Sequence, residues 1–144
     1  MDRNDVKLLQ KQLSFPLYAC SRELIKRCRP GLDALGLTYT QYIVMLVVWE
    51  EGTISVRDLG RRLYLDSGTL TPVLKTLEQQ ELVTRERSKQ DERVLLVTAA
   101  EKGIALRDEA MARHSEMTVR SGLDAQEEAQ LTHLLYKVLA SAEK

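Results

Sequence analysis

The chain has few of the residues that build disulfides or metal sites. Among its 144 residues, only Cys20 and Cys28 are cysteines and only His114 and His133 are histidines. The histidines lie far along the chain from the cysteines, and the spacing is not that of a metal site. If both cysteines lie on one helix, the rise between them is about 12 Å, which argues against a disulfide. The two cysteines therefore fit a reducing compartment.

Long apolar runs and an excess of charge are missing too. No apolar run approaches the roughly 20 residues that cross a bilayer, and the polar start is unlike a signal peptide. We therefore expect a cytoplasmic protein without membrane contact. The formal net charge is zero, from 21 basic and 21 acidic residues, whereas nucleic-acid-binding domains usually carry a basic excess. Any surface that attracts DNA must therefore depend on where the basic residues are placed.

Catalytic motifs are also missing. The sequence has no glycine-rich phosphate loop, no metal-ligand spacing and no nucleophile paired with a base. We therefore expect neither an enzyme nor a bound cofactor or metal.

Apolar residues recur every three or four positions along most of the chain, which predicts a mainly helical protein. The first helix is expected over residues 6–28, with a kink near Pro16 or a helix that restarts there, and a break at Arg29-Pro30-Gly31. A helix that is apolar nearly all round is expected over 39–50, at the centre of the core. Two more helices are expected at 99–117 and 124–142. The length fits a single domain, 1–144.

The stretch that begins at Ser55 predicts two short helices followed by a β-hairpin. Ser55 is expected to cap the first helix, and Asp66 or Ser67 the second. Short β-branched runs at 82–88 and 93–98 form the hairpin. A short helix fits the major groove of DNA, and an arginine-tipped hairpin can reach beside it. The segment therefore indicates a winged helix-turn-helix that binds double-stranded DNA.

The order of these elements and the hairpin motif Asp91-Glu92-Arg93 resemble the MarR family of transcription regulators. The similarity is closer to its organic-hydroperoxide-resistance branch, the OhrR type, and covers nearly the whole chain. It is carried by four runs: Leu13–Glu23, Leu37–Tyr42, Leu63–Lys75 and Arg85–Ser88. The resemblance implies a homodimeric repressor of a pseudo-palindromic operator. Its winged-helix core would span about 38–98, and its dimerisation helices about 6–36 and 100–142.

The resemblance also implies which residues contact DNA. On the recognition helix these would be Ser67, Thr69, Thr71, Pro72 and Lys75. On the wing, Arg93 would be the tip arginine that reaches the minor groove, and Asp91 would orient it through a charge-assisted hydrogen bond. Arg85 and Arg87 would support the wing or touch phosphate.

The sensor position departs from the branch's pattern. Its reactive cysteine stands in the context Leu-Cys-Phe, where this chain has Ser14, and a serine cannot be oxidised to a sulfenic acid. Where relatives often have a tyrosine before a Lys-Pro or Arg-Pro step, this chain has Cys28. The resemblance puts Cys28 near the usual sensor pocket of the partner chain, together with Tyr39 and Tyr42. Tyr39 could donate a hydrogen bond to a thiolate there.

Three interpretations of this departure stay open. In the first, sensing of organic hydroperoxide has moved to Cys28, with Arg27 and Arg29 favouring its thiolate. In the second, redox sensing is lost and a small hydrophobic molecule binds the same inter-helix pocket. In the third, Ser14 is an engineered replacement, which leaves Cys28 unexplained. Cys20 is expected to be a core residue, or else a second thiol.

A purely protein-binding helical domain is the alternative from another functional class. Such a domain needs no basic hairpin, so the arginines around residues 85–93 favour a DNA-binding regulator.

Overall fold

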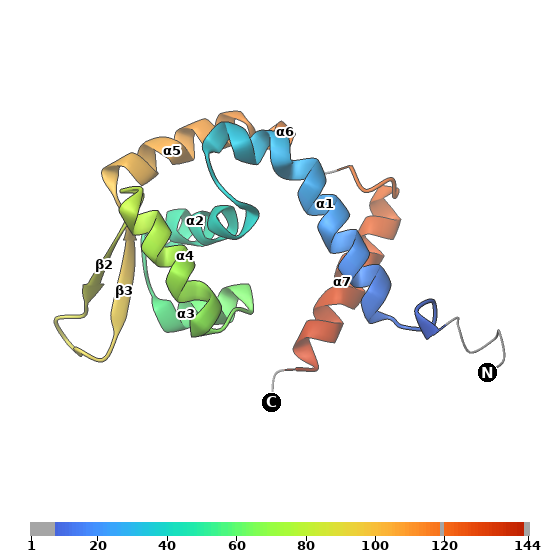
Figure 1. Cartoon of the computed structure of the whole chain (residues 1–144), viewed down its shortest axis with the longest axis horizontal. Coiled ribbons are helices and arrows are strands. Elements are labelled where there is room, and N and C mark those ends of the chain that lie inside the picture. The colour runs from blue at the N-terminus through green and yellow to red at the C-terminus, as the bar shows by residue number, and fades with distance from the viewer. Residues whose placement is uncertain (1–7, 119, 143–144) are drawn as a thin grey trace. The chain divides into compact units, whose positions relative to one another are not determined.

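The computed structural model describes residues 8–118 and 120–142 (Figure 1). In chain order its elements are α1 (Ser14–Leu35), α2 (Tyr39–Glu51), β1 (Thr53–Ser55), α3 (Val56–Leu63), α4 (Ser67–Gln79), β2 (Val83–Arg87), β3 (Leu95–Ala99), α5 (Glu101–Ala112), α6 (His114–Met117) and α7 (Ala125–Ala140). This order confirms a mainly α-helical fold with a small β-hairpin. The chain forms two compact units, one of residues 25–117 and one of residues up to 24 with those from 118 onward.

The unit of residues 25–117 is built around α2. Val44, Met45 and Val48 of α2 are fully buried, and α2 contacts α3, α4, α5, β1 and β3. Each fully buried side chain of this kind stabilises the fold by about 1.5–3 kcal/mol relative to an exposed one. The helix predicted to be apolar nearly all round is therefore the centre of the core.

The sheet has three antiparallel strands in the order β1-β3-β2. Val97 of β3 is fully buried and lies opposite Ile54 of β1 on one side and Arg85 of β2 on the other. The predicted hairpin is therefore correct. The sequence did not predict β1, because its three residues are too few to show an alternating pattern.

Side-chain caps begin α2, α3 and α4, and the caps at Ser55 and Asp66 are among those that the sequence predicts. Thr38 accepts a hydrogen bond from the Gln41 backbone N–H (3.2 Å), and the Gln41 side chain accepts one from the Thr38 N–H (3.0 Å), which completes a capping box. Ser55 caps α3 and Asp66 caps α4. Gly52 ends α2 with a φ of 77°, a left-handed conformation that glycine adopts without strain.

The start of α1 differs from the prediction. Residues 6 and 7 of the predicted helix lie outside the described residues, and residues 8–13 form turns rather than α-helix. The helix begins at Ser14, so Pro16 lies in its first turn, where the N–H that proline lacks would have no partner within the helix. Of the two expectations for Pro16, the kink is therefore wrong, and the start of a helix near this proline is the one that agrees with the structure.

The end of α1 also differs, because the helix continues through Pro30 to Leu35. Its last turns bury Leu32 and Leu35, which are 3% and 7% exposed. Burying two leucines contributes about 3–6 kcal/mol in total, which offsets the cost of about 3 kcal/mol for an interior proline. The expected break at Arg29-Pro30-Gly31 is therefore wrong, since tertiary packing outweighs the local preference.

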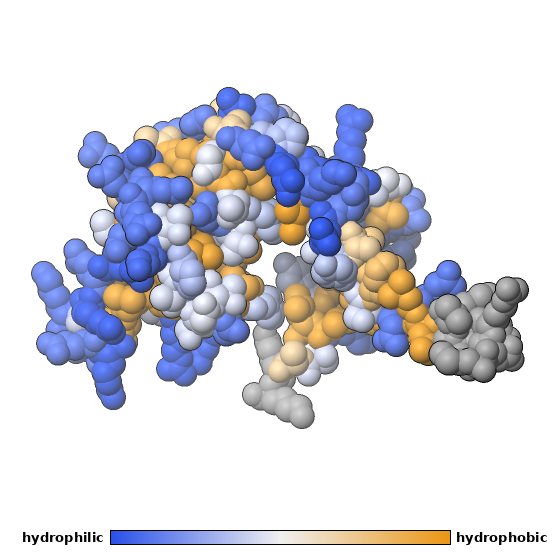
Figure 2. All heavy atoms as spheres, viewed as in Figure 1, coloured by the Kyte–Doolittle hydropathy of each residue, from blue (hydrophilic) through white to orange (hydrophobic). Residues whose placement is uncertain are grey.

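The final helix, α7, confirms the prediction for 124–142 and begins with a capping box between Asp124 and Glu127. None of its residues is buried. Leu131, Leu134 and Val138 are about half exposed, and hydrophobic side chains reach the surface there (Figure 2).

In the described chain, no helix taken singly is long and apolar enough to cross a membrane, although α1 and α2 together pass that test as a bent pair.

We predict that Gly103→Ala destabilises the protein by about 1–3 kcal/mol or more, the range for overpacked cores. A Cβ at Gly103 would overlap the carbonyl oxygen of Leu82, which is backbone and cannot rotate away. The matched control is Gly68→Ala on α4, where the nearest atom is Asp66 Oδ1 at 3.4 Å. That change should be neutral or slightly stabilising, because alanine favours helix. Urea denaturation measures both, and equal stabilities would contradict the close contact of α5 with Leu82.

Candidate nucleic-acid interface and sensor site

Helix α4 has one buried face and one exposed face. Leu70, Leu74 and Leu77 recur at helical spacing and are at most 1% exposed, so they fix how the helix is turned. The residues predicted to face DNA all lie in solvent: Ser67, Thr69, Thr71, Pro72 and Lys75. The exposed face therefore consists of short hydroxyl side chains, a proline and one lysine, which can approach another surface closely.

Asp66 holds the first turn of α4. Its Oδ1 accepts a hydrogen bond of 2.7 Å from the Thr69 backbone N–H. That bond lowers the pKa of Asp66 below its ordinary value, because it stabilises the charged carboxylate. The carboxylate also satisfies an N–H that has no partner inside the helix. Asp66 therefore contributes to helix geometry rather than to a cation site.

The wing carries an exposed, oriented arginine. The Arg93 side chain lies in the turn between β2 and β3 and is 90% exposed. Its Nε and Nη2 donate to Asp91 Oδ1 and Oδ2 at 3.1 and 3.2 Å, and the Arg93 backbone N–H donates to the same carboxylate at 3.1 Å. These bonds lower the pKa of Asp91. The contact predicted between Asp91 and Arg93 is therefore confirmed.

Arg85 joins the wing to α4. Its Nη2 donates to Glu78 Oε1 at 3.2 Å and its Nε to Glu78 Oε2 at 3.4 Å. The Arg85 side chain is only 20% exposed, and the contact lowers the pKa of Glu78. Arg87 is exposed and donates to the Glu92 carbonyl oxygen at 3.5 Å. Of the two roles predicted for Arg85, the contact supports a part in holding the wing.

Arg62 of α3 also joins two elements. Its Nη2 and Nη1 donate to Glu50 Oε2 and Glu51 Oε1, both at 2.9 Å, and so tie α3 to the end of α2. Sequence analysis missed Glu50, Glu51 and Glu78 as positioning residues. No local signal could identify them, because their partners are 7 to 12 positions away on other elements.

Cys28 is buried, with 6% of its surface exposed. Its Sγ donates a weak hydrogen bond to the Met117 carbonyl oxygen at 3.8 Å. Burial raises the pKa of Tyr42, and Cys28 and Tyr39 raise it further through their electrostatic interaction with the phenol. Cys28, Tyr39 and Tyr42 therefore lie near one another within a single chain.

The chemistry of Cys28 follows from its burial. Burial raises the pKa of the Cys28 thiol above its ordinary value, because a thiolate is poorly solvated there. Among the described residues no cation lowers the pKa of Cys28, so the expected effect of Arg27 and Arg29, which are both exposed, is wrong. Reactive cysteines usually combine a low pKa with access to solvent. Cys28 is therefore a protected thiol in this conformation.

Cys20 and Ser14 belong to the other compact unit. Both are exposed, and both cysteines are free thiols. The expectation that Cys20 is a core residue is wrong, because it lies on the part of α1 that buries no side chain. Within the described ranges, no three His, Cys, Asp or Glu side chains come together as metal ligands.

Comparison with known proteins gives a consistent result. Residues 26–110 match the family model for the SarA/Rot transcriptional regulators. The chain is 45% identical to the organic hydroperoxide resistance transcriptional regulator of Bacillus subtilis, over 91% of this chain and 89% of that protein. It is also similar to reduced AbfR bound to DNA, with 32% identity, full coverage of both chains and a TM-score of 0.81. A mutant MarR from E. coli in complex with operator DNA is 26% identical, with a TM-score of 0.76 and coverage of 96% of this chain and 99% of that one.

We predict slow alkylation of Cys28 in the Cys20→Ser variant, where it is the only thiol. Because its pKa is raised and its Sγ is shielded, iodoacetamide should modify the folded protein slowly at neutral pH. The rate should continue to rise with pH beyond the ordinary range of a cysteine, and unfolding in guanidinium should make labelling fast. Mass spectrometry measures the labelled fraction. Rapid labelling of the folded variant at neutral pH would contradict a buried Cys28.

Proposed function

This chain belongs to the SarA/Rot family of transcriptional regulators, and from that premise we propose that it represses transcription as a homodimer on a pseudo-palindromic operator. The family consists of regulators and not of enzymes. The observation that carries the proposal is the polar, exposed face of α4 beside the exposed Arg93 of the wing. The mutant MarR and reduced AbfR, both similar to this chain, have been solved on DNA.

Helix α4 and the wing contact DNA as one rigid unit. Helix α4 enters the major groove, where Thr69, Thr71 and Lys75 reach base edges or phosphates. Arg93 enters the adjacent minor groove. The Glu78–Arg85 contact supports this arrangement, because it links α4 to β2 at 3.2 Å and so holds the wing at a set distance from the helix.

The zero net charge is compatible with DNA binding because three of the acids near this surface are engaged. Glu78 pairs with Arg85, Asp91 with Arg93, and Asp66 caps α4. A carboxylate that is already hydrogen-bonded to an arginine repels phosphate less than a free one does. Lys75 lies on the exposed face of α4 and supplies a positive charge there.

A second copy of the chain covers α7. In a monomer, Leu131, Leu134 and Val138 of α7 would remain exposed to water. Such exposure is unfavourable for a row of large apolar side chains. In a dimer the two α4 helices can lie about 34 Å apart, one turn of DNA, and so read two half-sites. The operator then has the same twofold symmetry as the protein. Such a regulator acts where the DNA lies, and we place it in the cytoplasm.

The inducer is an organic hydroperoxide that oxidises Cys28. The thiolate sulfur attacks the outer oxygen, the O–O bond breaks, and the alkoxide takes a proton and leaves as an alcohol. Sulfur becomes a sulfenic acid, whose added oxygen must find room beside the Met117 carbonyl, 3.8 Å from Sγ before the reaction. Moving Met117 would shift α6 and the adjoining end of α5, and with them the spacing of the two α4 helices. The hydroperoxide-resistance regulator of B. subtilis and the overoxidised form of AbfR support this chemistry.

The alternative is a regulator that responds to a small hydrophobic molecule without redox sensing. The raised pKa and the burial of Cys28 favour it, because both slow the reaction of a thiol with peroxide. The same oxidation experiment distinguishes the two.

We predict that Arg93→Ala weakens binding to the DNA upstream of the gene by about tenfold or more, since a lost groove contact costs about 1–3 kcal/mol. Fluorescence anisotropy measures the affinity, and light scattering should report an unchanged dimer. Arg107→Ala on α5 is the matched control, because Arg107 pairs with Asp108 and lies outside the proposed interface. Equal affinities of the Arg93 variant and the control would contradict the role of the wing.

We predict that cumene hydroperoxide releases the wild-type protein from DNA, that dithiothreitol restores binding, and that Cys28→Ser stays bound. Cys20→Ser is the control and should respond like wild type. Because a buried serine hydroxyl can destabilise the core, Cys28→Ala is a second variant, checked for folding by circular dichroism. Release of both Cys28 variants by peroxide would reject Cys28 as the sensor. Tight binding of the wild type in both states would favour the alternative.

A further inference from the structure

Tyr64, in the turn between α3 and α4, has a backbone conformation that tyrosine rarely adopts. Its φ of 57° and ψ of 37° lie in the left-handed region, which glycine enters without strain and a bulky residue does not. Among the described residues, Tyr64 and Glu81 are the two non-glycine residues with a positive φ. A tyrosine at position 64 therefore costs stability that a glycine there would not cost.

The turn itself is held tightly against α3. The Leu65 backbone N–H donates to the Gly60 carbonyl oxygen at 3.0 Å, and the Tyr64 N–H donates to the Arg61 carbonyl oxygen at 3.4 Å. A Cβ at Gly60 would lie 2.8 Å from the Leu65 carbonyl oxygen, so the turn approaches α3 as closely as a glycine permits. Tyr64 cannot leave the left-handed region without loss of these contacts, and its position before α4 is therefore fixed.

The fold gains little from the tyrosine side chain. Tyr64 is 49% exposed, and in the described part of the chain no hydrogen bond engages its hydroxyl. The neighbouring Leu63 and Leu65 are the residues of this turn that pack against the core. Backbone strain that the core does not require is concentrated at sites that bind a ligand. The strained and exposed Tyr64 is therefore a candidate for a contact outside the chain.

Tyr64 lies next to the surface proposed to face DNA. Because Leu63 and Leu65 pack inward, Tyr64 between them lies on the solvent side, like Ser67 and Thr69 at the start of α4. Figure 1 shows that the turn leads directly into the first turn of α4. A helix that enters the major groove has a phosphate backbone on each side, and tyrosine hydroxyls are among the groups that bind phosphate oxygens.

From these observations we propose that Tyr64 contacts the DNA backbone at the edge of the groove that α4 enters. Its hydroxyl donates a hydrogen bond to a phosphate oxygen, and the negative charge of that oxygen strengthens the bond. The contact rests on the proposed function in DNA binding and adds a residue to it. Since every nucleotide carries the same phosphate, the contact increases affinity without reading the sequence.

The variant Tyr64→Phe tests the hydroxyl, because it keeps the ring and the backbone conformation. Fluorescence anisotropy compares it with the wild type on two duplexes of equal length, the DNA upstream of the gene and a duplex of unrelated sequence. The affinity for both duplexes should fall by the same factor, about tenfold, as expected for a lost hydrogen bond to a charged group. Light scattering should report an unchanged dimer.

The variant Tyr64→Gly separates the contact from stability. Glycine adopts the left-handed conformation without strain, so the urea midpoint should be equal to that of the wild type or higher. The affinity for both duplexes should nevertheless fall at least as far as in Tyr64→Phe. Loss of affinity in a variant that is no less stable cannot result from unfolding.

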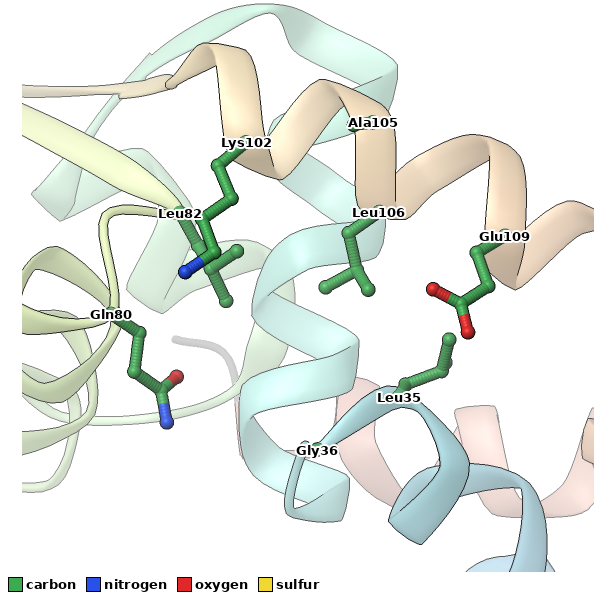
Figure 3. Close-up of a pocket in the computed structure, with 8 residues that line it drawn as sticks. All are labelled: Leu35, Gly36, Gln80, Leu82, Lys102, Ala105, Leu106 and Glu109. Atoms are coloured by element: carbon green, nitrogen blue, oxygen red, sulfur yellow. The ribbon is translucent and has the colours of Figure 1, made fainter.

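Glu81→Gly is the matched control, because Glu81 has a φ of 63° at the opposite end of α4. It follows Gln80, which lines a hollow against α5 (Figure 3), and the 13 residues of α4 place it about 20 Å from the start of the helix. This change relieves the same kind of strain and should not weaken binding to either duplex.

Two results would overturn the proposal while leaving the proposed function intact. One is an affinity of Tyr64→Phe equal to that of the wild type, and the other is a loss confined to the upstream duplex, which would indicate a contact with a base. If the wild type bound neither duplex, DNA binding itself would be rejected, and the Tyr64 contact with it.

Discussion

The burial of α2 is the constraint on which the rest of the structure depends. This helix is apolar on nearly all sides, and α3, α4, α5 and β3 pack around it to exclude water. The Trp49 indole reaches across to donate to the Gly103 carbonyl, so even its polar atom has a partner inside the fold. Because α4 must turn Leu70, Leu74 and Leu77 toward this core, its hydroxyl side chains and Lys75 have to face solvent. The surface proposed to face DNA is thus a consequence of core packing.

Ion pairs in this protein position elements more than they stabilise them. Exposed pairs contribute little to stability, typically below about 1 kcal/mol. Glu78–Arg85 links the recognition helix to the wing, and Arg62 links α3 to the end of α2. The same pairing helps a chain without net charge to suit a polyanionic partner, since Glu78 and Asp91 near the proposed interface are bonded to arginines.

Cys28 illustrates a conflict between packing and reactivity. The last turns of α1 bury Cys28, Leu32 and Leu35 together, and burial raises the pKa of the Cys28 thiol. A sensor at this position gains selectivity from that protection, because an oxidant must enter the packed region beside Met117, but it loses speed.

The sequence by itself determined the helical repeat, the cap at Ser55, the hairpin and the family. These features depend on residues within a few positions of one another, so their physical cause is visible along the chain. Only the tertiary structure decided that α1 continues through Pro30, that Cys28 is buried while Cys20 is exposed, and that Arg85 binds Glu78. Each of these depends on atoms brought together from distant positions, where the free energy of packing outweighs the local preference of the chain.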